Sequence, residues 1–295
     1  MISGSRRTGA TAILLATGLL GTAGCLGAGA SAAGSSPHPV VGSSSSGSAS
    51  SADPKSASAA KASSSPSSSL VGKVVAIDPG HDGGNEDHAD EIAQLVPQGF
   101  GVEKACDTTG TNGPDGYTEH EFNFAVSLDV EALLQAKGIT VVMTRTNDTG
   151  VGPCVDVRAA IGNNAHANAA VSIHADGYDG GGHGYQILTA DQSVGGPSNV
   201  AASQQLAVDM HNSLSAESGL VPSTYAGTDG YEPRDDIAGL NLSTVPKVLV
   251  ELGNMHDPGD LALEESTTGQ QNMAQAIVAG IIAFLQGSGS SSAPS

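Results

Sequence analysis

The stretch Ala169–Asp176, with the sequence AAVSIHAD, begins as an apolar run and ends on a histidine and an aspartate. Two other stretches have the same form, Val74–His81 (VVAIDPGH) and Pro246–Gly253 (PKVLVELG). Short apolar runs of this kind predict strands that are buried inside a sheet. Because chemistry in an open α/β sheet gathers beyond the carboxyl ends of the strands, we expect the polar residues of all three stretches at one edge.

Helical patterns alternate with these strands. Apolar residues recur at helical spacing after Thr118, and Thr118 with Glu121 fits a capping box that starts a helix there. Further helices are expected over 155–167, 199–215 and 273–285, and further strands over 139–144 and 184–188. This order predicts an α/β sandwich with a mostly parallel or mixed sheet. The stretch 85–116 has no clear period and is expected to be a long loop.

Composition divides the chain into four segments. Residues 1–27 have a short basic start and an apolar run too short for a permanent membrane anchor, which indicates an export signal. Residues 28–69 are almost all Ser, Ala, Gly and Pro and predict a disordered tether. The folding unit is expected over 70–286, and a second disordered tail over 287–295.

The export signal leaves two alternatives open. The sequence Thr22-Ala23-Gly24-Cys25 resembles a bacterial lipobox, which predicts that Cys25 carries lipid and anchors the chain to the outer face of the cytoplasmic membrane. Plain cleavage close by, between Ala28 and Ala32, predicts a freely secreted protein instead.

The charge balance argues against nucleic acid as a partner. The chain has a net charge of −19 and only 11 Lys and Arg residues, whereas phosphate binding needs clustered cations. We expect the protein to be a monomer.

The cysteine count supports export. With Cys25 lipidated or removed, Cys106 and Cys154 remain, and in an oxidising compartment we expect them to form a disulfide. Two buried free thiols are the alternative.

Two histidines at strand ends indicate a metal centre. His81 follows the first strand and a Pro-Gly turn, and His174 ends another strand. A catalytic zinc site adds a third protein ligand and keeps one position open for water. Glu119 is the preferred third ligand, because the capping box occupies Glu121. Asp176 is expected to orient an imidazole or to bind substrate, with a simple turn residue as the alternative.

Glu251 stands inside an otherwise apolar strand, where an unpaired carboxylate is costly to bury. Two interpretations follow: a salt bridge to Arg145, Arg158 or Arg234, or a general base beside the metal.

These motifs together resemble the zinc-dependent N-acetylmuramoyl-L-alanine amidases, a family of peptidoglycan hydrolases. The resemblance covers roughly residues 73–285 and rests on five motifs in the same order: Asp78–His81, Glu119-x-Glu121-x-Asn123, Thr144-Arg145, Ser172–Asp176, and Asn241–Pro246 continuing into Val250–Gly253. It implies a six-stranded sheet flanked by helices, Zn²⁺ held by His81, Glu119 and His174, and a catalytic Glu251. Asn254-Met255-His256 departs from the family's usual Phe-Leu/Met-Ser/Thr-Asn and is expected to alter the cleft wall.

The expected reaction is cleavage of the amide bond between N-acetylmuramic acid and the L-alanine of the stem peptide, in the cell envelope. Arg145 and Arg234 are candidates to stabilise the oxyanion or to bind stem-peptide carboxylates, with ion pairs to acidic side chains as the alternative. Arg158, inside a helix, is expected to be structural. Other zinc hydrolases of the envelope (a peptidoglycan peptidase or a sugar N-deacetylase) and a non-catalytic envelope-binding module are the rival interpretations.

Overall fold

The three apolar stretches form neighbouring parallel strands in the computed structural model, which describes residues 70–287. They are β1 (Val74–Pro79), β5 (Ala169–Asp176) and β8 (Lys247–Asn254), with β5 between the other two. Their carboxyl ends therefore lie at one edge of the sheet, as the sequence predicts.

The complete sheet has six strands in the order β4, β1, β5, β8, β6, β7. The three outer strands are β4 (Thr140–Met143), β6 (Gln186–Ala190) and β7 (Tyr231–Arg234). Neighbours are parallel except at β6, which runs antiparallel to β8. The prediction of a mixed, mostly parallel sheet of about six strands is confirmed.

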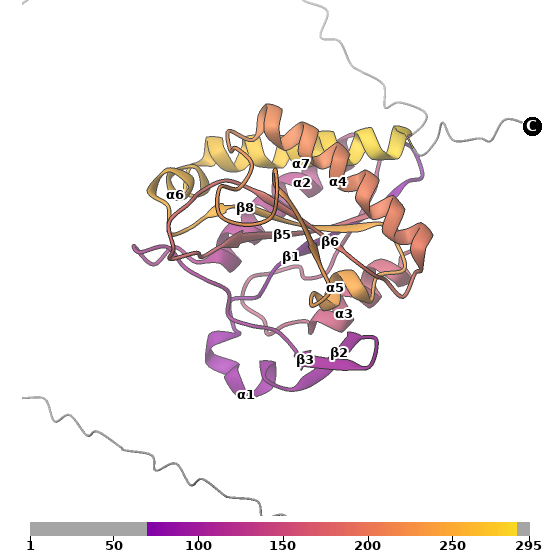
Figure 1. Cartoon of the computed structure of the whole chain (residues 1–295), viewed down its shortest axis with the longest axis horizontal. Helices are drawn as coiled ribbons and strands as arrows, with labels where there is room; N and C mark the ends of the chain where they lie inside the picture. Colours follow the sequence, from indigo (N-terminus) through magenta and orange to yellow (C-terminus); the bar gives the residue numbers. More distant parts are fainter. Residues whose placement is uncertain (1–69, 288–295) are drawn as a thin grey trace, which may run out of the picture. The chain divides into compact units, whose positions relative to one another are not determined.

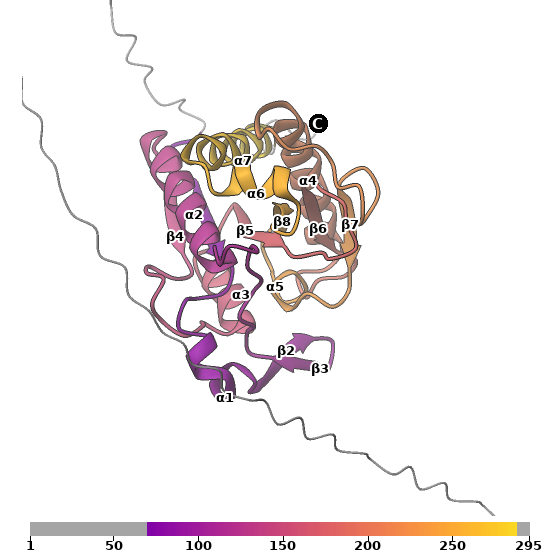
Figure 2. The ribbon, with the colours of Figure 1, turned by 90° about the vertical axis from the view of Figure 1, so that its left-hand side faces the viewer.

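Helices cover both faces of the sheet (Figures 1 and 2). On one face lie α2 (Glu119–Ala136), α4 (Pro197–Glu217) and α7 (Thr267–Gly287). Helices α2 and α4 pack on the strands, and α7 packs against both of these helices. On the other face lie α3 (Val155–Asn164) and the short α5 (Ala238–Asn241). The main apolar core fills the space between the sheet and the three long helices, which makes this a three-layer sandwich.

The expectation of a long loop over 85–116 is wrong in part. This stretch forms η1 (Glu86–His88), α1 (Ala89–Ile92) and an antiparallel hairpin of β2 (Leu95–Gly99) and β3 (Val102–Ala105), which packs on α3 and α5. Most side chains of the hairpin are exposed or only partly buried, so its strands carry no hydrophobic pattern.

Three further elements were not predicted. They are β7, a short edge strand, the short helix α5, and α6 (Pro258–Glu264), which starts at the N-cap Asp257. In addition, α7 begins at Thr267, six residues before the expected start at Met273, because its first turn is polar.

Cys106 and Cys154 form the expected disulfide, which links the end of the hairpin to the N-cap of α3. Gly287, expected in a disordered tail, is the last residue of α7. The expected signal over 1–27, with Cys25, and the expected tether over 28–69 lie outside the described residues, as does 288–295. Within 70–287, no helix is both long and apolar enough to cross a membrane.

Candidate metal centre and cleft

His81 lies two residues beyond the end of β1, in a tight turn. The Gly80 amide bonds the carbonyl of Ile173 on β5, which holds the turn to the sheet. His81 itself has φ of 57°, a left-handed conformation that is uncommon outside glycine. A Cβ at Gly80 would overlap the imidazole of His174, so only glycine permits the turn to pass this close to the second histidine.

Glu119 is the first residue of α2, and it faces both histidines. Its Oε1 lies 3.2 Å from Nε2 of His81 and 2.9 Å from Nδ1 of His174. Its Oε2 accepts the amide of Thr111 at 2.9 Å. Glu121 is engaged instead in the capping box with Thr118, as the sequence analysis assumed. The structure therefore brings Glu119, and not Glu121, to the histidines.

His81, Glu119 and His174 form a group that fits a metal ion. Their ligand-type atoms all lie within 4.8 Å of one another, although the residues come from three separate elements. Two imidazoles and one carboxylate are a ligand set of catalytic zinc sites, which leave a fourth position for water. The residues present thus match the ion that the resemblance implies.

The protonation of His81 can be deduced from its partners. Its Nδ1 lies 3.0 Å from the carbonyl oxygen of Thr108, and a carbonyl oxygen only accepts hydrogen bonds. Nδ1 therefore carries a proton, and a neutral His81 offers its lone pair at Nε2, the atom that faces Glu119.

The charges of the three residues are coupled. Burial favours the neutral form of Glu119, but His81 and His174 outweigh burial and hold the pKa of Glu119 well below its usual range. Burial likewise opposes a charge on His81, yet Glu119 and Asp107 raise the pKa of His81 to about 10. The negative carboxylate thus makes this group attractive to a cation.

Glu251 lies on β8 directly beside His174 on β5. Its Oε2 is buried and has no hydrogen-bond partner within the described residues. Burial, with Glu119 and Asp176 nearby, raises the pKa of Glu251 well above its usual range. No ion pair found in residues 70–287 joins Glu251 to Arg145, Arg158 or Arg234, so the salt-bridge interpretation has no support.

A cleft of about 440 Å³ opens over these residues. The cleft is lined by all three residues of the metal group and by Glu251, together with Asp176 and Arg234. The carboxylate of Asp176 accepts hydrogen bonds from Tyr225 and Gln186, which anchors this part of the wall. The side chain of Arg234 is about one-third exposed, at 34%, and pairs with Glu232 and Asp236.

Arg145 lies elsewhere. It is buried, and its guanidinium donates to the carbonyls of Pro79, Gly80, His120 and Asn147 and to Asp148. It does not line the cleft, so its placement does not support the expectation that it binds substrate. The structure instead supports the alternative, an ion pair to an acidic side chain, because Arg145 pairs with Asp148. Its bonds to the Pro79 and Gly80 carbonyls also hold the turn that precedes His81.

The segment after Cys106 also contributes to the site, which sequence reasoning missed. Asp107 and Thr108 contact the ring of His81, and the Thr111 amide bonds Glu119. Their only sequence signal is proximity to Cys106. His256, in the segment that departs from the family pattern, bonds Asp179 and Thr111, and Thr111 lines the cleft.

Comparison with known proteins gives a consistent result. The family model described as N-acetylmuramoyl-L-alanine amidase matches residues 75–283. The chain is 43% identical over 224 residues to N-acetylmuramoyl-L-alanine amidase Rv3717 of Mycobacterium tuberculosis, covering 74% of this chain and 88% of the relative.

Two crystal structures are similar to this fold as well. That of the N-acetylmuramyl-L-alanine amidase Ami1 from Mycobacterium smegmatis is 45% identical with a TM-score of 0.70, covering 74% of this chain and 99% of that chain. The apo form of Ami1 from Mycobacterium abscessus is 43% identical with a TM-score of 0.69, covering 73% of this chain and 100% of that chain.

Proposed function

The chain belongs to the N-acetylmuramoyl-L-alanine amidase family, and from this premise we propose that His81, Glu119 and His174 hold the zinc ion of its active site. It is a peptidoglycan hydrolase that cleaves the amide bond between N-acetylmuramic acid and L-alanine. One observation carries the zinc assignment: three ligand-type side chains from separate elements converge within 4.8 Å, beside an unpartnered Glu251.

A zinc ion held there supplies a Lewis acid for the carbonyl and lowers the pKa of a bound water to about 7. The ligand atoms offered by this chain are Nε2 of His81, a carboxylate oxygen of Glu119 and Nδ1 of His174. Glu119, whose pKa is held low, remains a carboxylate across the working pH range.

Glu251 is the proposed general base and acid. Its carboxylate takes a proton from the attacking water and later gives it to the departing nitrogen of L-alanine. Burial raises the pKa of Glu251, and a carboxyl whose pKa is raised toward neutrality exchanges protons more readily in both directions. Its Oε2 has no hydrogen-bond partner in the described part of the chain, which leaves this oxygen free to exchange the proton.

The part of the cleft wall that contains Arg234 is proposed to bind the stem peptide. Arg234 lines the cleft and is partly exposed, so its guanidinium suits the carboxylates of the peptide. Asp176 is proposed to hold the wall through Tyr225 rather than to contact zinc.

The protein is proposed to act outside the cytoplasm. A peptidoglycan substrate implies the cell envelope, and an export signal over 1–27, a tether over 28–69 and a catalytic domain over 70–286 would place it there. Attachment through a lipidated Cys25 is the finer proposal, as is action as a monomer.

Digestion of purified peptidoglycan followed by mass spectrometry tests this function. We expect intact stem peptides with a free L-alanine amino terminus, lost after zinc chelation and restored by zinc. Shortened peptides would indicate a peptidase, loss of acetyl groups a deacetylase, and no product a binding module. Release that is unaffected by chelation would contradict the zinc proposal.

A further inference from the structure

The imidazole of His81 is held from behind by the segment that follows Cys106. Its Nδ1 lies 3.0 Å from the Thr108 carbonyl and 3.3 Å from Oδ1 of Asp107. His174, in contrast, lies within β5 and is paired with Glu251 of β8. His81 lies beyond its strand and lacks that support, so the contacts to Nδ1 help to set the orientation of its ring.

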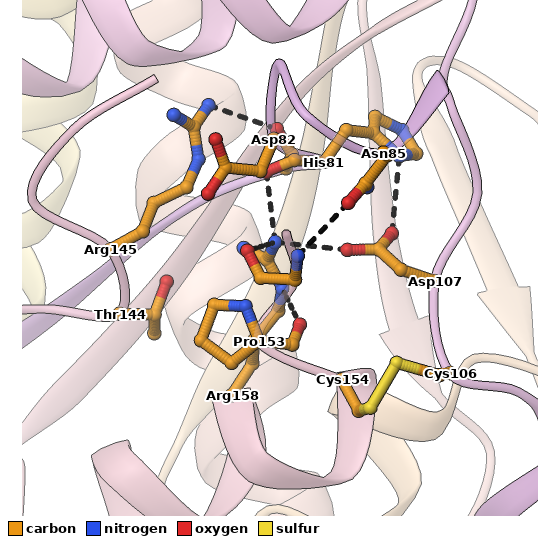
Figure 3. A network of polar contacts seen from close by, with 12 residues as sticks. His81, Asp82, Asn85, Cys106, Asp107, Thr144, Arg145, Pro153, Cys154 and Arg158 are labelled. Carbon is orange, nitrogen blue, oxygen red and sulfur yellow. Dashed lines mark hydrogen bonds and ion pairs between the residues drawn. A yellow bond between two sulfur atoms is a disulfide. The ribbon is translucent and has the colours of Figure 1, made fainter. Parts of the chain in front are cut away.

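The segment after Cys106 is fastened to the start of α3. The disulfide joins Cys106 to Cys154, and the amide of Val155 donates to the Cys106 carbonyl at 2.8 Å. Asn85, fully buried, donates to the Thr108 carbonyl and accepts from the Gly152 amide. Figure 3 shows the disulfide, Asn85 and the ring of His81 around the same small region.

Arg158 also connects the segment after Cys106 to the turn at His81 and to the start of α3. Its guanidinium donates to Oδ2 of Asp107 at 3.0 Å and to the carbonyl of His81 at 2.8 Å (Figure 3). It also donates to the turn that precedes α3, at the carbonyls of Gly152 and Pro153. Only 4% of the Arg158 side chain is exposed, so these hydrogen bonds form away from solvent.

We propose that the Cys106–Cys154 disulfide, Asp107 and Arg158 form one positioning unit that orients His81 for metal binding. The disulfide keeps the 106–108 segment against α3, Arg158 holds the Asp107 carboxylate, and Asp107 and the Thr108 carbonyl fix the ring. None of these residues is a ligand; they act through His81. This inference rests on the proposed zinc site.

Loss of a residue that orients a metal-bound histidine typically lowers metal affinity about 10- to 100-fold. We expect Asp107→Ala to weaken zinc binding by this order, and Asp107→Asn, which keeps an oxygen near Nδ1, to recover part of the loss. The Cys106→Ala/Cys154→Ala protein should weaken zinc binding as well. The disulfide and Asp107 both act through the ring of His81. Adding Asp107→Ala to the cysteine variant should therefore lower zinc affinity by less than the two separate effects combined.

Zinc affinity is measured by competition with a chromophoric chelator, and the ligand environment by the visible absorption of the cobalt-substituted protein. Circular dichroism confirms that each variant is folded. The matched control is Asn199→Ala, which removes buried hydrogen bonds from α4 to Ser193 and Ser243, none of which involves His81, Asp107 or Arg158. The control should lose stability and keep both zinc affinity and the cobalt spectrum of the wild type.

A folded Asp107→Ala protein with wild-type zinc affinity and an unchanged cobalt spectrum would overturn the proposal. Equal loss of zinc affinity in Asn199→Ala would overturn it too, because the effect would then follow general destabilisation. Should the cysteine variant not fold, the two Asp107 variants decide alone. If wild-type protein binds no zinc, the proposed function itself fails, which is a distinct result.

Discussion

Two regions of the molecule each supply one carboxylate to the cleft, and the two carboxylates are opposite in character. Glu119, at the start of α2, lies against two imidazoles and accepts a hydrogen bond from the amide of Thr111. Glu251, within β8, has a buried oxygen with no partner in the described part of the chain. The surroundings lower the pKa of Glu119 and raise that of Glu251.

This contrast assigns the roles. Two acids whose pKa values are driven apart by their environments commonly divide the work of an active site, one staying charged and the other exchanging protons. The start of α2 thus provides a permanent negative ligand, and β8 provides a group that can bind and release a proton. Substitutions in the two regions should therefore change different quantities: zinc affinity for Glu119 and turnover for Glu251.

The largest effect is expected for Glu251→Gln. The amide keeps the size of the side chain but cannot take up a proton, so turnover should fall about 10²- to 10⁴-fold. Zinc content, measured by atomic absorption, should stay at the wild-type level because Glu251 is not a ligand. Full activity in a zinc-loaded Glu251→Gln protein would remove Glu251 from its role.

Glu119→Gln should show the reverse pattern. Loss of a residue that only orients a ligand lowers metal affinity by up to about 100-fold. Loss of the ligand Glu119 itself should lower zinc affinity by more than this, and activity should fall because less metal is bound. Excess zinc should restore part of the activity. Chelator competition and amidase assays across a zinc titration measure both quantities, and unchanged zinc affinity would contradict the assignment.

Glu264 sharpens the comparison, because it too has a buried carboxyl oxygen without a partner in the described residues but does not line the cleft. Neither of its carboxyl oxygens has a partner within 70–287, and burial, with Asp260 and Glu119 nearby, raises its pKa from 4.5 to about 9. Between these values the folded protein holds a proton that the unfolded chain releases. Stability should therefore fall as pH rises through this window, by about 1.4 kcal/mol per unit.

Glu264→Gln should abolish that slope, so its gain over the wild type in the free energy of unfolding should be larger at pH 8 than at pH 5. Urea unfolding at both pH values measures the difference. The control is Glu217→Gln, an exposed position near the end of α4, which should show no such change. Identical slopes in wild type and Glu264→Gln would show that Glu264 is ionised at pH 8.

The smallest effect is expected for Glu121→Gln, next to the ligand on the same helix. Glu121 accepts from the amide and hydroxyl of Thr118, so the substitution should cost about 1 kcal/mol or less of stability. Zinc affinity should not change. Thermal unfolding and chelator competition measure both, and a marked loss of zinc would mean that Glu121 takes part in the site.

The comparison also explains what the sequence could predict. His174 and Glu251 stand on long apolar strands, where a polar residue is conspicuous, and the capping box separated Glu119 from Glu121. The same strands predicted a mixed, mostly parallel sheet, although not the order of its strands. The resemblance to a known family then joined residues that local patterns could not bring together.

The region behind His81 could not be predicted, because its order comes from tertiary contacts. Asp107 and Thr108 are ordinary polar residues in a stretch without periodicity, and their roles depend on the disulfide and on Arg158. The hairpin β2–β3 has mostly exposed side chains, so nothing in its composition marks it as a pair of strands. Arg145 illustrates the converse: its residue type suggested substrate binding, but its carbonyl partners are visible only in the fold.

An anomalous difference map at the zinc absorption edge, from crystals of the zinc-loaded protein, tests the metal assignment most directly. We predict one strong peak enclosed by Nε2 of His81, the carboxylate of Glu119 and Nδ1 of His174, with Glu251 adjacent and outside the ligand set. Under saturating zinc, a map of the folded protein with no peak at these three side chains would contradict the account.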